Sequence, residues 1–162
     1  MMPGDLPVFL GIAISTSGGQ RVDRLNETIV VPDNFTREFA ERFQNLALNW
    51  KNGPIYLEPL NWIERGVVRW LNNPDANCWL QFKKGCNSAK SRHLLWHDAD
   101  LLLLDPDFFE EHYQSCIDGN YCCFGVNESW DSWYRDNGFS HVTSTWEILL
   151  DLPWVRNFAP WQ

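Results

Sequence analysis

Two aspartates, Asp98 and Asp100, interrupt the segment 93–104, which is otherwise apolar and typical of a buried strand. Ionised carboxylates without partners are costly in such a setting, so their charge must be compensated, most simply by a divalent cation. Residues two apart on a strand point to the same side, so both carboxylates can reach one Mn²⁺ or Mg²⁺ ion, with water and a substrate phosphate as further ligands. The pair by itself allows a metal site, but for an isolated D-x-D the favoured interpretation is that both aspartates leave the sheet in a polar turn.

Strand and helix patterns alternate around this segment, and together they predict an α/β layer with a largely parallel sheet. Ligands of such sheets bind beyond the carboxyl ends of the strands, which is where Asp98 and Asp100 would lie. Apolar runs predict strands at residues 8–15, 28–32, 55–57, 93–97 and 121–126. Helices are predicted at 36–50 with Asn34 as the cap, 62–71, 78–90, from Asp105 as the cap onward, and 146–152 before Pro153, whereas 130–144 has no regular pattern.

Length, charge and cysteine content argue against several classes of protein. The 162 residues suffice for one domain, expected over 1–162, and the net charge of −8 without a Lys/Arg-rich run argues against nucleic-acid binding. No apolar run approaches the ~20 residues that span a bilayer, and residues 7–15 are too short and lack the basic flank of a secretory signal. The five cysteines form neither a C-x-x-C pair nor an even set, so we expect reduced thiols and a cytoplasmic protein.

The stretch 83–100 contains a glycine, Gly85, and an alanine four residues later, Ala89. A predicted buried strand follows and ends in a D-x-D motif, formed by Asp98 and Asp100. This stretch resembles GT-A nucleotide-sugar transferases of the family-2 type. Upstream, residues 29–39 resemble the first strand of the family, together with the proline, polar turn and helix that follow it. Residues 55–58 resemble the second strand of the family. The resemblance covers roughly 28–125, with a weaker similarity of 137–139 and 146–147 to galactosyltransferase-like members.

The resemblance implies a fold and an activity. The fold would be a GT-A-like α/β/α sandwich with a mostly parallel central sheet. The activity would be that of a metal-dependent, inverting glycosyltransferase of the hexosyltransferase type. Such an enzyme moves a sugar from a nucleotide-diphosphate donor to a hydroxyl of a carbohydrate or glycan acceptor. UDP-sugars are the favoured donors. The chain ends soon after Trp161, where such enzymes continue with acceptor-binding elements, so we expect either a fragment or a minimal version.

Carried over position by position, the resemblance also implies site residues. Asp100 would bind the metal directly, and Asp98 would contact the ribose or a metal-bound water. Phosphate would meet Lys83 or Lys90, although asparagine is common at the place of Lys83. The nucleotide pocket would be lined by Pro32, Asn34, Arg37, Gly85 and Glu58, the last of which replaces the usual aspartate.

The catalytic base is less well defined, because the family's W-G-x-E-D sequence is absent. An inverting transferase needs a carboxylate that deprotonates the acceptor, and Glu147 is the first candidate, with Asp131 and Asp151 behind it. Two other classes stay open. One is a non-catalytic nucleotide-sugar or carbohydrate-binding domain, and the other, less favoured, is an HD-type metal phosphohydrolase, suggested by the adjacent pair His97-Asp98.

Overall fold

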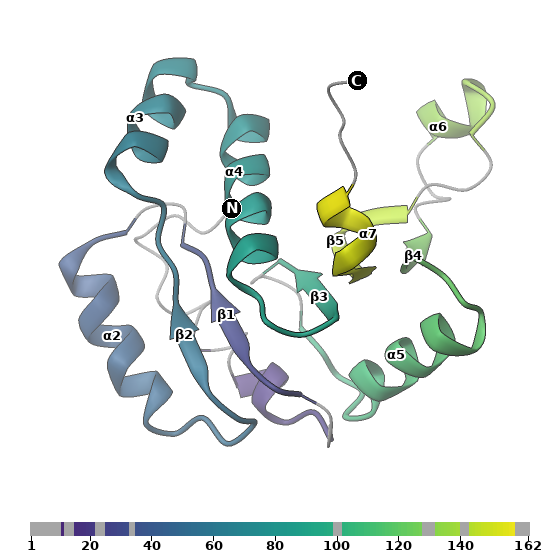
Figure 1. The fold of residues 1–162 in the computed structure, drawn as a ribbon, viewed down its shortest axis with the longest axis horizontal. Coiled ribbons are helices and arrows are strands. Elements are labelled where there is room, and N and C mark those ends of the chain that lie inside the picture. The colour runs from purple at the N-terminus through teal and green to yellow at the C-terminus, as the bar shows by residue number, and fades with distance from the viewer. Residues whose placement is uncertain are drawn as a thin grey trace.

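Two small sheets form the framework of the protein (Figure 1). The computed structural model describes residues 11, 15–21, 25–32, 35–98, 102–127, 132–139 and 143–157. In the first sheet, β1 (Thr28–Val30) pairs in parallel with β2 (Ile55–Leu57). In the second, β5 (Thr143–Asp151) lies between β3 (His93–His97) and β4 (Cys123–Asn127) and is antiparallel to both.

This arrangement contradicts the predicted GT-A-like sandwich with a mostly parallel central sheet. The only parallel strand pair among the described residues is β1–β2. The error arises at 146–152, which we predicted as a helix and which belongs almost entirely to the central strand β5. Helices cover both faces of this strand, so its apolar residues do not alternate with polar ones, and periodicity alone cannot separate such a strand from a buried helix.

The end of β5 also reverses the expected role of Pro153. We expected this proline to stop a helix, but it stands at the second position of α7 (Leu152–Asn157). Proline is well tolerated in the first helical turn, because the backbone N–H it lacks would have no partner within the helix. The strand therefore passes directly into α7.

Helix α2 (Arg37–Ala47) lies within the predicted range 36–50 and covers the β1–β2 sheet with an apolar face. Phe39 and Phe43 are buried there against Val30, Ile55 and Leu57. The cap differs from the prediction, since Thr36 rather than Asn34 accepts a hydrogen bond from the backbone N–H of Phe39, at 3.1 Å.

The next two helices follow strong local signals. Helix α3 (Trp62–Leu71) has the predicted bounds, because a capping box of Asn61 and Glu64 begins it and Asn72 ends it in the left-handed conformation. Helix α4 (Pro74–Ser88) begins four residues before the predicted start and continues through Gly85. Its cap is Asn73, whose side chain accepts hydrogen bonds from the N–H groups of Asp75 and Ala76.

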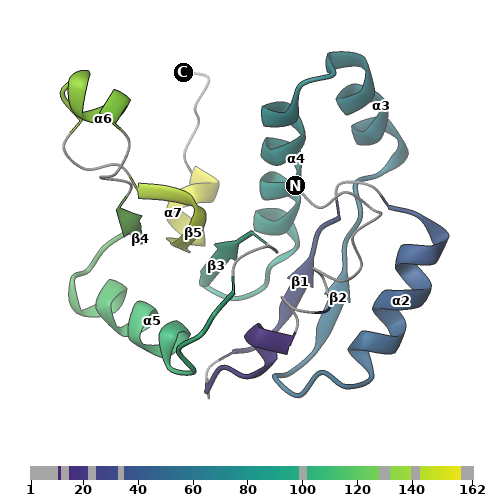
Figure 2. The same ribbon diagram turned by 180° about the vertical axis from the view of Figure 1, so that it is seen from behind.

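Helix α5 (Phe108–Asp118) covers one face of the β3–β5–β4 sheet, and α4 and α7 lie on the other (Figure 2). Its cap position is Asp107, two residues later than the predicted Asp105. Two further differences concern segments without strong periodicity. A short helix, α6 (Ser132–Asp136), lies in the segment expected to be irregular, and Gly11 and Ser15, the described residues of the predicted first strand, are helical.

The last turn of α4 joins the two sheets. Cys86, Ala89 and Leu152 form a buried cluster there, against which Ile29 of β1 and Leu94 of β3 pack. All five cysteines are free thiols, and burial raises the pKa of Cys86 to about 11 in spite of the nearby Arg156. None of the described helices is both long and apolar enough to cross a bilayer.

The contact of Gly85 with the next strand can be tested by substitution. A Cβ atom at Gly85 would lie 3.1 Å from the Trp96 ring, whereas no described atom lies within 4 Å of a Cβ at Gly66 in α3. We expect Gly85→Val to lower the free energy of unfolding by about 1–3 kcal/mol through overpacking. The matched variant Gly66→Val should stay within about 0.5 kcal/mol of the wild type. Urea denaturation followed by circular dichroism measures both, and equal effects would contradict the packing of α4 on β3.

Candidate functional site

A pocket of about 600 Å³ lies between the two sheets. Residues of β1 and the loop before it form one wall, and residues 91–98 of the β3 segment form another. Helix α4 contributes Gln81 and Gly85, and α5 contributes Phe109, Glu110 and Tyr113. A volume in this range suits a nucleotide or a ligand of similar size.

Three of the predicted donor-site residues meet in this pocket. Pro32 follows β1, Gly85 lies in α4, and Asp98 follows β3, and all three line its wall. The end of β1 is held in place by Gln81, whose side-chain amide donates to the carbonyl of Val31 at 3.1 Å. Residues up to 66 positions apart in the sequence thus border one space.

Four other predicted donor-site residues lie outside the pocket lining. Arg37 is almost fully exposed and pairs with Glu41 one turn along α2. Lys83 is exposed on α4, and its neighbour Lys84 approaches Glu58 to 4.0 Å. Lys90 places its ammonium group 5.4 Å from the centre of the Tyr56 ring. Asn34, Asp100 and Asp131 fall outside the described residues.

His97, the residue before Asp98, is held by contacts at both of its ring nitrogens. His97 Nδ1 lies 3.0 Å from the backbone carbonyl oxygen of Asp98, and His97 Nε2 lies 3.5 Å from the hydroxyl of Ser17. Asp98 itself is half-buried at the pocket wall. The histidine therefore fixes the backbone at the point where β3 ends and the aspartate begins.

The charges around the pocket are mostly negative. Glu27, Asp98 and Glu110 line it, and among its described lining residues Arg92 is the only lysine or arginine. No group of three or more histidine, cysteine, aspartate or glutamate side chains in the described part of the chain could enclose a metal. An oxygen donor such as Asp98 fits an ion that is completed by water and a ligand's phosphate, and does not fit a cage built from protein alone.

Glu147, the first candidate for the base, does not line the pocket. It stands opposite His97 in the β3–β5 pair and is only 3% exposed. Its Oε1 lies 3.0 Å from His112 Nε2 of α5. The approach lacks hydrogen-bond geometry, so neither carboxylate oxygen of Glu147 has a hydrogen-bond partner among the described residues. Its surroundings are those of a buried polar contact between sheet and helix.

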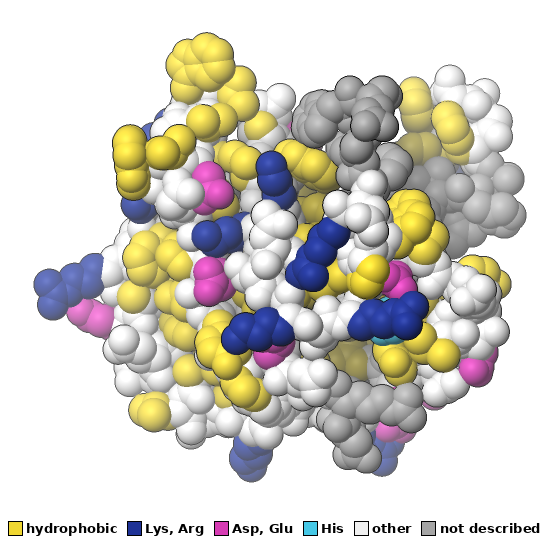
Figure 3. Space-filling model, in the orientation of Figure 1, with side chains coloured by type: hydrophobic (Ala, Val, Ile, Leu, Met, Phe, Trp, Pro, Cys, Tyr) yellow, Lys and Arg dark blue, Asp and Glu magenta, His cyan; other side chains and the backbone are white. Residues whose placement is uncertain are grey.

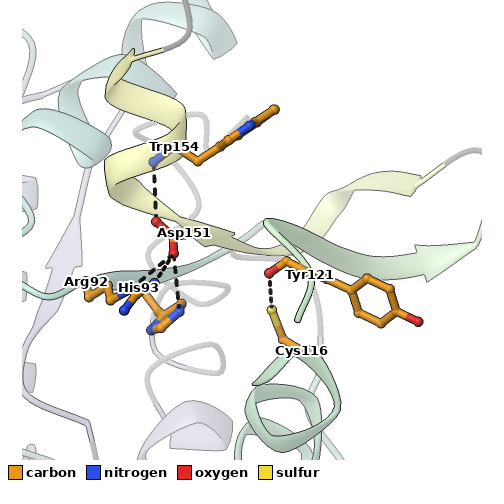
Figure 4. Close-up of polar contacts among 6 residues, drawn as sticks. All are labelled: Arg92, His93, Cys116, Tyr121, Asp151 and Trp154. Atoms are coloured by element: carbon orange, nitrogen blue, oxygen red, sulfur yellow. Dashed lines mark hydrogen bonds and ion pairs between the residues drawn. The ribbon is translucent and has the colours of Figure 1, made fainter. Parts of the chain in front are cut away.

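Asp151, the third candidate, is engaged at the end of β5 (Figure 4). The Arg92 guanidinium donates two hydrogen bonds to Oδ2, at 3.0 and 3.1 Å, and the Trp154 backbone N–H donates to Oδ1 at 3.3 Å. Burial by itself would raise the pKa of Asp151, but these hydrogen bonds outweigh it and hold the pKa below the usual value. Burial lowers the pKa of the nearby His93, against the attraction of Asp151.

Sequence reasoning missed several residues that line the pocket. His93, Glu110 and Tyr113 are among them, and His93 and Tyr113 contact each other edge to face with ring centres 5.3 Å apart. The spacing of four between Phe109 and Tyr113 marks one face of α5 and could have identified these two residues. For His93 no sequence signal was available, because any residue of a buried strand can face either side.

The depressed pKa of Asp151 predicts a pH-dependent contribution to stability. Folding favours the ionised carboxylate, so the stabilisation is present above the usual pKa of 3.8 and is lost as the pH falls through the lower folded-state value. We expect Asp151→Asn to lower the free energy of unfolding near neutral pH, and the gap to the wild type to close below pH 3.8. Urea denaturation across this range measures it, with the exposed Asp118→Asn as control; a gap that persists in acid would contradict the ion pair.

The chain matches no protein-family model, and neither curated proteins nor solved structures show a significant similarity to it.

Proposed function

We propose that this protein is a metal-dependent glycosyltransferase that binds a nucleoside-diphosphate sugar in the pocket between β1 and β3. The observation that carries the proposal is the meeting of Pro32, Gly85 and Asp98 around one space of suitable size. The proposal concerns this pocket and not the arrangement of the sheets, which differs from the mostly parallel one of GT-A enzymes.

The charge of the pocket supports dependence on a divalent cation. A diphosphate carries negative charge, and the wall already holds three carboxylates against one arginine. Without an added cation these groups would repel the ligand. Asp98, together with Asp100, would hold Mn²⁺ or Mg²⁺, which when bound stabilises the negative charge that develops on the leaving nucleoside diphosphate.

Aromatic side chains supply the other half of nucleotide recognition. Trp50, Trp96, Phe109 and Tyr113 line the pocket. Such rings offer flat apolar surfaces on which a base can stack, and the mixed character of this pocket suits a ligand with an apolar end and a charged end. A UDP-sugar has this form.

The position of Glu110 makes it the proposed catalytic base. It is the carboxylate that α5 contributes to the pocket, so it approaches from a different element than Asp98. A base must reach the acceptor hydroxyl, and a group in the pocket wall meets this requirement better than Glu147 or Asp151, neither of which lines the pocket. Glu110 would accept the proton of the acceptor as the new glycosidic bond forms.

The second candidate function is a domain that binds a nucleotide sugar without transferring it. Two of the three carboxylates predicted as bases are held away from the pocket, Glu147 beside His112 and Asp151 beside Arg92, and this favours binding alone. Turnover of UDP-sugars by the wild type separates the two functions.

Binding of the donor can be measured directly. We expect UDP to bind the wild type in the presence of Mn²⁺ and to bind at least about tenfold more weakly when EDTA replaces the metal. Asp98→Asn should produce a similar loss, because it removes a charged oxygen donor from the pocket wall. Isothermal titration calorimetry gives both dissociation constants.

The matched control for this measurement is Asp118→Asn, an exposed aspartate at the end of α5 that does not line the pocket. It should bind UDP and Mn²⁺ as the wild type does. Circular dichroism verifies that each variant is folded. Metal-independent UDP binding, or equal binding by folded Asp98→Asn, would refute the proposed site.

The proposed base is tested by turnover. We expect Glu110→Gln to reduce UDP release from UDP-sugars in the presence of glycan acceptors by about 10²-fold or more, with UDP affinity little changed. Glu147→Gln should leave UDP release per folded molecule close to that of the wild type and act mainly on stability. If Glu147→Gln abolishes turnover and Glu110→Gln does not, the assignment is reversed; if the wild type binds UDP but releases none from any UDP-sugar, the protein is a binding domain.

A further inference from the structure

Helix α3 presents its apolar half to solvent. Trp62 is 77% exposed and Trp70 82%, and Ile63, Val67 and Leu71 are exposed beside them. At 100° per residue these five side chains fall within one half of the helix, together with Gly66. None of the ten residues of α3 is buried.

The orientation of this helix is the reverse of the usual one. In a surface helix the apolar stripe faces the core and the charged residues face water. Here Glu64, Arg65 and Val68 are the half-buried residues, and the two tryptophans point outward. Large contiguous apolar patches of this kind mark interaction sites.

The segment that carries this surface is basic in an acidic protein. Residues 62–92 contain six lysines and arginines and two acidic residues, although the whole chain has a net charge of −8. Figure 3 shows hydrophobic side chains gathered over α3, with Lys and Arg side chains across the middle of the same face. The cations of the segment are Arg65, Arg69, Lys83, Lys84, Lys90 and Arg92. Arg92 is paired with Asp151 and Lys84 lies 4.0 Å from Glu58, so the charge of this surface rests on the other four.

We propose that the α3–α4 face binds the surface of an anionic lipid bilayer. Trp62 and Trp70 would enter the interfacial region, where tryptophan is favoured because its ring is apolar and its N–H can still reach polar groups. Arg65, Arg69, Lys83 and Lys90 would lie near acidic headgroups, each adding attraction that salt screens. Exposed tryptophans and a local positive charge together fit this partner better than a second copy of the chain, which would bring like charges together.

The test uses the full chain and vesicles of two compositions, phosphatidylcholine alone and phosphatidylcholine with about 30 mol% phosphatidylglycerol. Co-sedimentation gives the bound fraction. We expect binding to the mixed vesicles, weaker binding to phosphatidylcholine alone, and a decrease as NaCl is raised. The double variant Trp62→Ser/Trp70→Ser should bind at least about tenfold more weakly.

The matched control is Trp133→Ser, which removes an exposed tryptophan of α6 outside the α3–α4 face and should bind vesicles as the wild type does. Circular dichroism checks the fold of each variant, and Arg65→Gln/Arg69→Gln supplies a second, electrostatic variant with an expected loss on the mixed vesicles. The proposal is overturned if the wild type does not sediment with the mixed vesicles, or if folded Trp62→Ser/Trp70→Ser binds them equally. It is also overturned if light scattering shows a dimer that this variant dissociates, without vesicle binding, because α3 is then a contact between copies.

Discussion

The packing of the last turn of α4 determines how the rest of the protein is arranged. Gly85 allows the Trp96 ring of β3 to approach, since a Cβ there would lie 3.1 Å from it. Arg156 of α7 donates hydrogen bonds to the carbonyls of Cys86 and Ala89, at 2.5 to 3.2 Å, and so satisfies groups that the end of a helix leaves without partners. β1, β3 and α7 are therefore all positioned against one helix end.

This junction also explains the pocket. β1 and β3 belong to different sheets and share no ladder of hydrogen bonds in the described part of the chain, so their separation is set by the side chains of α4. The space between them carries Asp98 on one side and Glu110 on another. A glycine that the resemblance associates with the nucleotide site thus has a packing role that is independent of any ligand.

Local sequence signals determined several elements of the structure. The bounds of α3 follow from a capping box and a left-handed asparagine, and β1 and β2 follow from short apolar runs. The resemblance to GT-A transferases implied that Pro32, Gly85 and Asp98 lie close together, and all three line one pocket. These features depend on residues close in the chain or on a pattern already present in it.

Tertiary structure decided the features that depend on distant partners. Residues 146–151 form a strand because β3 and β4 supply hydrogen-bond partners on both sides and helices cover both faces, and nothing in an apolar run of this length separates that outcome from a helix. The same placement buries Glu147 beside His112 and directs Asp151 to Arg92, while Glu110 reaches the pocket. Packing therefore decides which carboxylates face the pocket. The sequence does not decide it, because the type and position of an acidic residue do not specify which side of a sheet or helix its side chain will face.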